Sequence, residues 1–419
     1  MSSGIVELST PAWGALDFLP EEVGTVEELR ARPWAKAGVA TVERTRIGVR
    51  LRFGGFVGRI HLPGHTINID ELVPGTAQAL ASFVAEGRRW SDEWADAGTI
   101  RVPAWTQLAS LYCAHLEKYV AAGIDKQYRG EYWVTGRPRG RIDVAATLAR
   151  QWARGRTQLL VCRPRVLTED TTVNRALYAA AMRADGLLRL ANSHDVDLAS
   201  LRRCLRAFSN VTSEVFPDLR AAVHHATGDA TTERLVGLAE LLIQGVGVFP
   251  SDASQRQPMD VWFNAAWLFE KAILRLASEI AGPSAARQGK GDGVSLLERD
   301  DFGSGGFVRM DADPDVVIGG GAGTAILDAK YRREGFEADR GQLYQLIAHA
   351  TAYRARAAAL VAPAMDAAST PITLLGRDSA GRRYFVLRVD AKSPERMRSI
   401  LQTWLRMNGM LSVPSVRAS

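Results

Sequence analysis

The chain has little cysteine and no long apolar run. Its three cysteines, Cys113, Cys162 and Cys204, are too far apart for the Cys-x-x-Cys spacing of a metal site, and their odd number argues against a disulfide framework. No run of about 18 apolar residues occurs, so the pattern excludes a membrane span. The first residues lack a basic segment followed by an apolar core, so we expect no signal peptide. These absences predict a cytoplasmic protein without a membrane partner.

Two catalytic signatures are also missing. No Gly-x-x-x-x-Gly-Lys-Ser/Thr loop occurs, so any nucleotide-driven motor must come from another chain. No Gly-x-Ser-x-Gly elbow indicates a serine hydrolase. The glycine-rich run at 319–323 lies between two predicted strands rather than before a helix, which predicts a turn and not a phosphate cradle.

What the chain has is a globular composition with an uneven distribution of positive charge. Its 419 residues suit two or three domains, and its net charge is +6. Nine arginines face only two acidic residues between Arg129 and Arg165. Such a stretch favours a phosphate-facing surface, within which we expect Arg137, Arg139 and Arg141 to contact DNA. A solvated face with no partner is the alternative.

Hydrophobic patterning predicts an α+β multidomain chain. Residues 1–40 are expected to be an irregular lead-in with one short helix, and 41–105 alternate with a period of two, which predicts a small β-rich module. Residues 106–255 are mainly helical by pattern, and 256–419 have the element order of an α/β sandwich with a mixed sheet. The individual elements predicted in the last two segments are helices at 108–120, 171–189, 198–208, 261–281, 339–356 and 394–407 and strands at 307–318, 324–332, 358–362, 372–375 and 384–390.

The most informative residues lie on the two strands around the glycine-rich turn. Asp328 and Lys330 are two residues apart, so their side chains leave the same face of a strand, and Asp315 lies on the neighbouring strand of the hairpin. Carboxylates that hold a divalent cation and a lysine that stabilises developing charge are what phosphodiester hydrolysis requires. Glu270, on the preceding helix, is a further acid that could join the site. An internal Asp328–Lys330 ion pair is the alternative.

These residues carry a family resemblance. The segments DPDVVI (313–318) and ILDAKYR (326–332), followed by the helix with Gln345, resemble the PD-(D/E)xK nuclease core in the form found in the McrC family. FVGRIHLPGHTINI (56–69), the block 123–143, TEDTTVNRAL (168–177) and NAAWLFEKAI (264–273) resemble further blocks of the same family. The resemblance spans roughly residues 45 to 355.

The resemblance implies a function and a set of roles. Asp315 and Asp328 would be catalytic acids that bind Mg²⁺ or Mn²⁺, and Lys330 the catalytic lysine, with Glu270 and Gln345 as supporting residues of a PD-(D/E)xK core. Tyr331 would pack or contact DNA. The chain would then be a DNA endonuclease subunit of a modification-dependent restriction system.

The resemblance also implies a partner. The chain would act with a McrB-like AAA+ NTPase hexamer that uses GTP or ATP, and the β module at 53–69 is the candidate docking surface, with a purely structural cap as the alternative. The competing function is a non-catalytic adaptor that activates the NTPase and uses a nuclease-like fold only to hold DNA.

Overall fold

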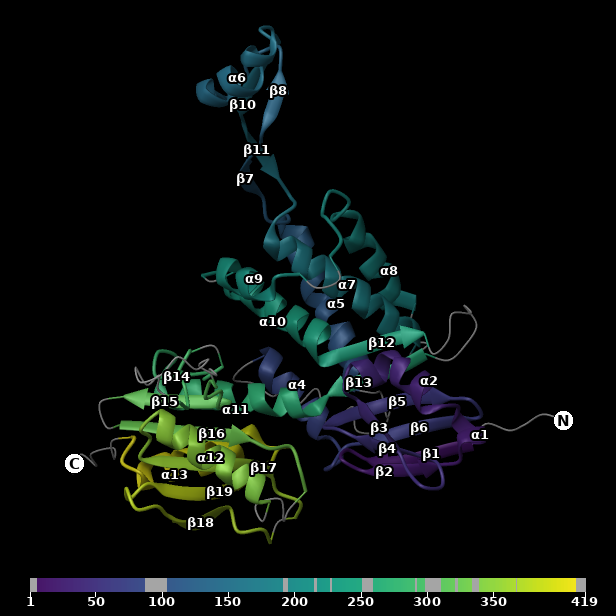
Figure 1. The fold of residues 1–419 in the computed structure, drawn as a ribbon, viewed down its shortest axis with the longest axis vertical. Helices are drawn as coiled ribbons and strands as arrows, with labels where there is room; N and C mark the ends of the chain where they lie inside the picture. The colour runs from purple at the N-terminus through teal and green to yellow at the C-terminus, as the bar shows by residue number, and fades with distance from the viewer. Residues whose placement is uncertain are drawn as a thin grey trace, which may run out of the picture. The chain divides into compact units, whose positions relative to one another are not determined.

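The structure is a computed structural model, and its chain folds into two compact units (Figure 1). One unit combines Met1–Trp105 with Gln244–Ser419, and the other is Thr106–Ile243. The β module and the α/β region therefore share a unit, and the helical middle ends near 243 rather than 255. The described residues are 6–86, 104–190, 195–214, 217–226, 228–250, 259–290, 292–297, 310–320, 323–333, 339–366 and 368–411.

The β module of the first unit has two sheets. The alternation in the sequence is confirmed, because Val49, Leu51 and Phe53 are buried in a core that also contains Trp34 and Ile60. The five-stranded sheet has the order β1 (Val6–Pro11), β6 (His65–Asp70), β5 (Phe56–Leu62), β13 (Met259–Asn264) and β12 (Val246–Pro250). The three-stranded sheet has the order β2 (Ala15–Phe18), β4 (Val49–Phe53) and β3 (Ala40–Arg44).

The prediction of an irregular lead-in is wrong. Residues before 40 supply β1, which pairs in parallel with β6, and β2, which pairs with β4. Three short helices follow, of which α2 begins with a capping box between Thr25 and Glu28. The strands with which β1 and β2 pair lie about 60 and about 35 residues away in sequence, so no local pattern predicts these pairings. The three helices are α1 (Pro20–Val23), α2 (Val26–Ala31) and α3 (Pro33–Lys36).

The rest of the first unit is a mixed six-stranded sheet between helices. Its order is β14 (Ala286–Arg287), β15 (Val316–Gly320), β16 (Gly323–Ala329), β17 (Ala357–Pro363), β19 (Arg383–Val389) and β18 (Ile372–Arg377). β16, β17 and β19 run parallel, and the β15–β16 hairpin is antiparallel, as predicted. The part of the predicted first strand before residue 310 lies outside the described residues.

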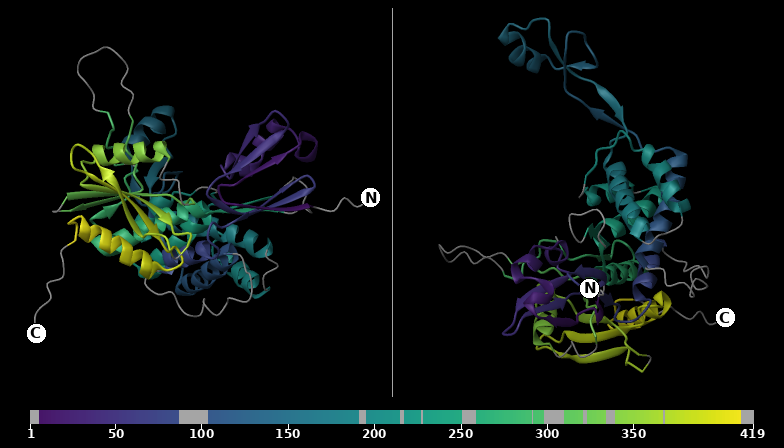
Figure 2. Two further views of the ribbon diagram at one scale, coloured as in Figure 1. Left: turned by 90° about the horizontal axis from the view of Figure 1, so that it is seen from below. Right: turned by 90° about the vertical axis from the view of Figure 1, so that its right-hand side faces the viewer.

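Helices cover both faces of this sheet. Helix α12 and helix α13 lie on opposite faces (Figure 2), and α11 packs with α13 and against β15 and β16. The predicted helix at 261–281 begins later, because residues up to Asn264 form β13, and the Asn264 side chain then accepts a hydrogen bond from the Trp267 amide as the N-cap. The helices are α4 (Thr76–Glu86), α11 (Ala265–Ala281), α12 (Arg340–Ala352) and α13 (Pro394–Met407).

The second unit is a helical bundle with a small β extension. Three predicted helices are confirmed, and Gly123, with φ of 96°, ends the first of them. The β content of residues 127–168, called the β extension below, was not predicted. The elements of the second unit are α5 (Ala104–Ala122), β7 (Gln127–Gly130), β8 (Trp133–Thr135), β9 (Arg141–Ile142), α6 (Val144–Arg150), β10 (Leu160–Arg163), β11 (Arg165–Thr168), α7 (Thr172–Leu190), α8 (Asp195–Arg206), α9 (Leu219–Ala226) and α10 (Ala230–Gly245). None of the described helices combines the length and hydropathy needed to span a membrane.

Candidate active site

The site lies where the β15–β16 hairpin meets the parallel strands. The register pairs Val316 with Leu327, so Asp315 and Asp328 come from opposing positions of the two strands. Asp328 lies two residues beyond Ile326, whose side chain packs in a core cluster with Leu346 of α12. Asp328 and Lys330 therefore leave the sheet on the face that α12 covers. The Lys330 amide donates to the Val361 carbonyl at 2.7 Å, which fixes the backbone of this strand end against β17.

An ion pair and a backbone hydrogen bond hold two of the carboxylates. Lys330 Nζ forms an ion pair with Asp328 Oδ2 at 2.7 Å, and Asp328 is only 1% exposed. The ion pair that the sequence offers as an alternative is therefore present. Asp315 Oδ2 accepts a hydrogen bond of 2.7 Å from the Ala329 amide. A carboxylate oxygen has more than one lone pair, so these two acids keep acceptor capacity beyond the Lys330 ammonium and the Ala329 amide.

Burial and neighbouring charges raise the pKa of Asp315 and of Glu270. Burial raises the pKa of Asp315 to about 8, with the negative charges of Asp328 and Glu270 adding to the rise and Lys330 opposing it. Burial also raises the pKa of Glu270, which Lys330 lowers and Asp328 raises. Three acids and one ammonium thus share this region, so its net charge is negative when all are ionised. A bound cation would offset that charge.

The donor set suits a magnesium ion that keeps most of its own waters. Among the residues that the structure describes, no group of three or more histidine, cysteine or acidic side chains is close enough to form a complete metal cage. Mg²⁺ is usually held by one or two carboxylates together with waters and substrate phosphates. Asp315 and Asp328, two buried carboxylates at opposing positions of the hairpin, fit that requirement.

The structure brings together four of the five predicted catalytic residues. Glu270 comes from α11 and interacts electrostatically with Lys330 and Asp328, although it lies 45 residues before Asp315 in the chain. Gln345 is exposed on α12, and no contact among the described residues joins it to the carboxylates. Its supporting role stays a prediction.

Sequence analysis missed His349. This residue lies one turn after Gln345 on α12 and is only 5% exposed, and neither ring nitrogen has a hydrogen-bond partner among the described residues. Burial lowers the pKa of His349, and its ring also interacts electrostatically with Asp328 and Lys330. The four-residue spacing from Gln345 is the signal that could have found it, because residues at i and i+4 share a helix face.

Tyr331 packs rather than faces solvent. Its side chain is 2% exposed, and its ring centroid lies 6.0 Å from that of Phe269. The prediction that Tyr331 contacts DNA is therefore wrong for its side chain, and the packing alternative is the observed one. Its backbone carbonyl accepts a hydrogen bond from the Trp13 indole, which links the β module to the strand of Lys330.

The predicted DNA-contacting arginines lie in the second unit. Arg137, Arg139 and Arg141 are exposed in the β extension, and the Arg139 guanidinium lies 5.7 Å from the centre of the Trp133 ring. Asp143, one of the two acids of the basic stretch, is paired with Arg163 at 2.8 Å. The stretch therefore presents most of its positive charge to solvent, which fits both a DNA contact and a solvated face.

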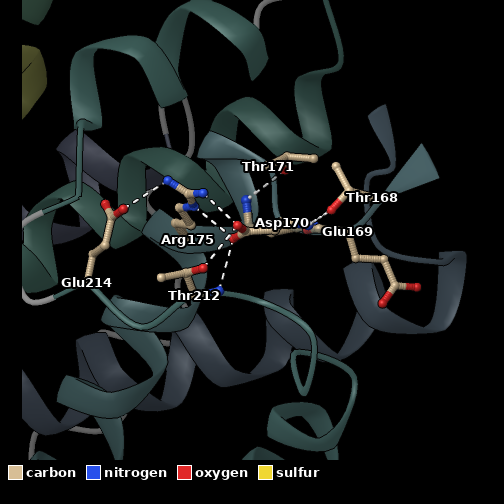
Figure 3. Close-up of polar contacts among 8 residues, drawn as sticks. Thr168, Glu169, Asp170, Thr171, Arg175, Thr212 and Glu214 are labelled. Carbon is tan, nitrogen blue, oxygen red and sulfur yellow. Dashed lines mark hydrogen bonds and ion pairs between the residues drawn. The ribbon is translucent and has the colours of Figure 1, made fainter. Parts of the chain in front are cut away.

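The TEDTTVNRAL block forms a polar network in the second unit rather than an open site (Figure 3). Arg175 donates to both oxygens of Asp170, and the Thr212 amide and hydroxyl donate to the same carboxylate at 2.9 and 3.0 Å. Arg175 also contacts Glu214 at 2.9 Å. These hydrogen bonds, that of Arg175 first, hold the pKa of Asp170 well below its usual range. Every charge in this network is paired, which indicates a structural role.

Asn174 of the same block holds both ends of the β extension. Its side-chain amide donates to the carbonyls of Asp125 and Glu169 at 2.8 and 2.7 Å, and its oxygen accepts from the Tyr119 hydroxyl at 2.8 Å. Asp125 precedes β7 and Glu169 follows β11. The Asn-Arg pair of this block therefore fixes the base of the β extension on α7.

The fold and the site first define a class of protein. The chain has two compact units, and the mixed α/β sheet of one unit carries a cluster of acids and a lysine that is compatible with a bound cation. Within that class the chain belongs to the family described as McrBC 5-methylcytosine restriction system component, whose model matches residues 51–363. This confirms the family membership that the sequence motifs indicate.

Solved structures similar to the chain come from the same system. One is a chain of a refined half-complex from a tetradecameric assembly of Thermococcus gammatolerans McrB AAA+ hexamers with bound McrC, 15% identical, with a TM-score of 0.44 over 95% of this chain and 100% of that chain. Another is a chain of the Thermococcus gammatolerans McrBC complex, 15% identical, with a TM-score of 0.35 over 65% of this chain and 87% of that chain. Among curated proteins none matches the chain.

Proposed function

We propose that the chain is a Mg²⁺-dependent DNA endonuclease subunit of a modification-dependent restriction system and that it works in the cytoplasm. The observation that carries the proposal is the convergence of Asp315, Asp328, Lys330 and Glu270 at one end of the β15–β16 hairpin. A mixed sheet with these acids and a lysine at a strand end is what the PD-(D/E)xK nuclease core requires. The family supports the restriction context.

Each residue of the candidate site has its own proposed role. Asp315 and Asp328 would hold the ion, which when bound polarises the phosphoryl oxygen and lowers the pKa of a coordinated water. The Lys330 ammonium, held beside Asp328, stabilises the negative charge that develops on the phosphate. Glu270 adds a carboxylate whose raised pKa reflects the same electrostatic environment. The expected products carry 5′-phosphate and 3′-hydroxyl ends.

The proposed partner is a McrB-like AAA+ NTPase hexamer that uses GTP or ATP. The candidate docking segment at 53–69 contains β5 and β6, each of which is paired on both edges, so a partner there would contact sheet faces or loops rather than add a strand. The β extension is a second candidate surface, because large apolar side chains are exposed on it, with Tyr128 at 69%. A Val144→Asp variant that loses NTPase stimulation while it stays folded would favour the β extension over the β module.

The test of the proposed function is cleavage of methylated plasmid DNA with Mg²⁺ and the AAA+ partner. We expect Asp328→Ala and Lys330→Ala to abolish cutting and to leave stimulation of the NTPase intact, since the site does not need to be active for docking. A folded variant of either kind that still cuts would overturn the site assignment. If neither the natural chain nor a variant cuts while all stimulate the NTPase, the chain is a non-catalytic adaptor.

A further inference from the structure

A cleft of about 940 Å³ lies in the first unit beside the proposed catalytic cluster. Glu270 contributes to its wall, and the residues that follow Lys330 on the chain form its rim. The opposite wall comes from the β module. The lining comprises Pro11, Ala12, Trp13, Gly14, Gly38, Thr41, Arg52, Phe53, Gly54, Gly55, Phe56, Asn264, Ala266, Trp267, Glu270, Arg332 and Arg333.

The cleft combines positive charge with aromatic rings. Its charged side chains are three arginines, Arg52, Arg332 and Arg333, and one acid, Glu270. Arg52 is paired with Glu43 at 3.1 Å, and Arg332 and Arg333 outweigh Glu270, so the net charge is positive. Four aromatic side chains line it as well. Arginines that bind phosphates and rings that stack on bases are the two components by which proteins hold a nucleic-acid strand. The volume is of the order expected for a small-molecule or nucleotide site.

Trp13 has a left-handed backbone, and two contacts hold its ring. Its backbone has φ of 65°, a left-handed conformation that costs a non-glycine residue about 1–3 kcal/mol. Its indole N–H donates to the Tyr331 carbonyl, and the ring is 40% exposed. Gly55 packs beneath it, since a Cβ there would lie 3.1 Å from the indole. A strained and immobilised tryptophan at the rim of a cleft is a feature that folding alone does not require.

Trp13 in turn positions Arg332. The guanidinium lies 4.3 Å from the centre of the indole ring, so it is held against the ring. A guanidinium fixed in this way keeps its N–H edge available for the two-point contact with a phosphate, and it loses little conformational freedom on binding. Arg332 is only two residues from Lys330. A phosphate held by Arg332 would therefore be near the one that Lys330 acts on.

We propose that this cleft binds the backbone of the DNA strand beside the scissile phosphate, with Arg332, stacked on Trp13, as the main phosphate contact. The inference rests on the proposed function, since it takes DNA as the substrate of the neighbouring cluster. Arg333, which is exposed on the same rim, adds a second contact. A phosphate held here aligns the strand with Asp315, Asp328 and Lys330.

The test is equilibrium binding of a fluorescently labelled DNA duplex to the full chain in EDTA, measured by anisotropy over a range of salt concentrations. We expect Arg332→Ala to weaken binding several-fold and to make the dependence of log K on log salt less steep by about one unit, as the loss of one phosphate contact does. Arg332→Lys keeps the charge but not the planar fork, so its affinity should be intermediate. The matched control is Arg377→Ala, an exposed arginine on edge strand β18, which should bind as the natural chain does.

Several outcomes would overturn the inference. One is a DNA affinity and a salt dependence of Arg332→Ala that equal those of the natural chain. Another is a loss of DNA affinity in Arg377→Ala as large as that in Arg332→Ala. A third is a natural chain whose DNA binding does not depend on salt. Normal DNA binding with lost NTPase stimulation in Arg332→Ala would assign the cleft to a protein partner instead. Because the assay needs no cleavage, it is separate from the test of the proposed function. A natural chain that binds DNA as expected but does not cut it would overturn the nuclease assignment and leave the cleft standing.

Discussion

Two clusters of acidic side chains, one in each compact unit, are built in opposite ways. In the second unit, the Asp170 carboxylate accepts hydrogen bonds from Arg175 and Thr212, and its pKa is lowered. In the first unit, Asp315 lies near two other carboxylates, and its pKa is raised to about 8. The carboxylate of Asp328 is paired with the Lys330 ammonium at 2.7 Å, which is the one ammonium among the three acids of this cluster.

The difference separates a structural cluster from a candidate functional one. A network in which the central carboxylate is bound by several hydrogen-bond donors lowers the free energy of the folded state, so folding alone explains it. A cluster of three carboxylates with a single ammonium raises that free energy, which supports the proposal that it binds a cation. The TEDTTVNRAL block and the ILDAKYR block both stand out in the sequence, and only their surroundings in the fold reveal this contrast.

The largest expected effect is on cleavage. Asp328→Asn, which keeps the shape of the side chain but not its charge, should reduce the rate of DNA cutting at least about 100-fold, because one of the two carboxylates that would hold the ion is lost. The melting temperature should stay within a few degrees of that of the natural chain. Single-turnover cleavage with the partner present measures the rate. A rate within a factor of two of the natural one would place Asp328 outside the chemistry.

The second prediction concerns the paired cluster. Asp170→Asn removes the charge that Arg175 and Thr212 bind, so it should lower the free energy of unfolding of the second unit by about 2–3 kcal/mol. Denaturant unfolding followed by circular dichroism measures this loss. Asp185→Asn, which removes the exposed Arg189 pair on α7, is the matched control and should cost less than about 1 kcal/mol. Equal losses in the two variants would mean that the network is no more than a surface ion pair.

The pH dependence of stability should have opposite signs in the two clusters. The lowered pKa of Asp170 means that its stabilisation is present above its ordinary pKa of 3.8 and is lost as the pH falls. The pKa of Asp315 is raised, so the metal-free folded chain loses stability as the pH rises from about 4 to about 8. Asp315→Asn should therefore stabilise the metal-free chain at pH 8 by about 1–2 kcal/mol, a few degrees in melting temperature. A destabilised Asp315→Asn variant would contradict the idea of uncompensated charge.

The smallest effect should come from metal addition. Mg²⁺ at ten times its dissociation constant should stabilise the natural chain by about 1.4 kcal/mol, because the ion binds the folded state only. The rise in melting temperature on addition of Mg²⁺ is measured for each variant against its own metal-free form. It should be absent in Asp315→Asn and as large in Asp170→Asn as in the natural chain. A shift of equal size in Asp315→Asn would place the ion elsewhere.

Local patterns in the sequence predicted much of this fold. The period-two alternation around Val49, Leu51 and Phe53 indicates strands, and the apolar faces of α5, α7 and α8 indicate helices, since each pattern depends only on near neighbours. The pairings β1–β6 and β13–β5 could not be predicted. They join residues that lie about 60 and 200 residues apart, and no local spacing encodes them.

The candidate site, like the fold, could be predicted from local spacing only in part. The Asp-x-Lys spacing places Asp328 and Lys330 on one face from sequence alone, and the turn at 319–323 implies the neighbouring Asp315. His349 was missed although its four-residue spacing from Gln345 is a weak signal, and Trp13 was missed because a tryptophan in a turn carries no signal until the fold brings it to Arg332. Tyr331 was assigned a DNA contact in part because burial cannot be read from its neighbours in sequence.

The most direct test of the nuclease assignment is the cleavage of methylated plasmid DNA with Mg²⁺ and the AAA+ partner, comparing the natural chain with its Asp315→Ala variant. Asp315 is a buried acid beside Asp328 and Glu270, and its pKa is raised to about 8, first by burial and then by their charges. We predict that the natural chain cuts and that the variant, folded and still able to stimulate the NTPase, does not. Cutting by Asp315→Ala at the natural rate would contradict the site assignment, and a natural chain that does not cut would contradict the nuclease assignment.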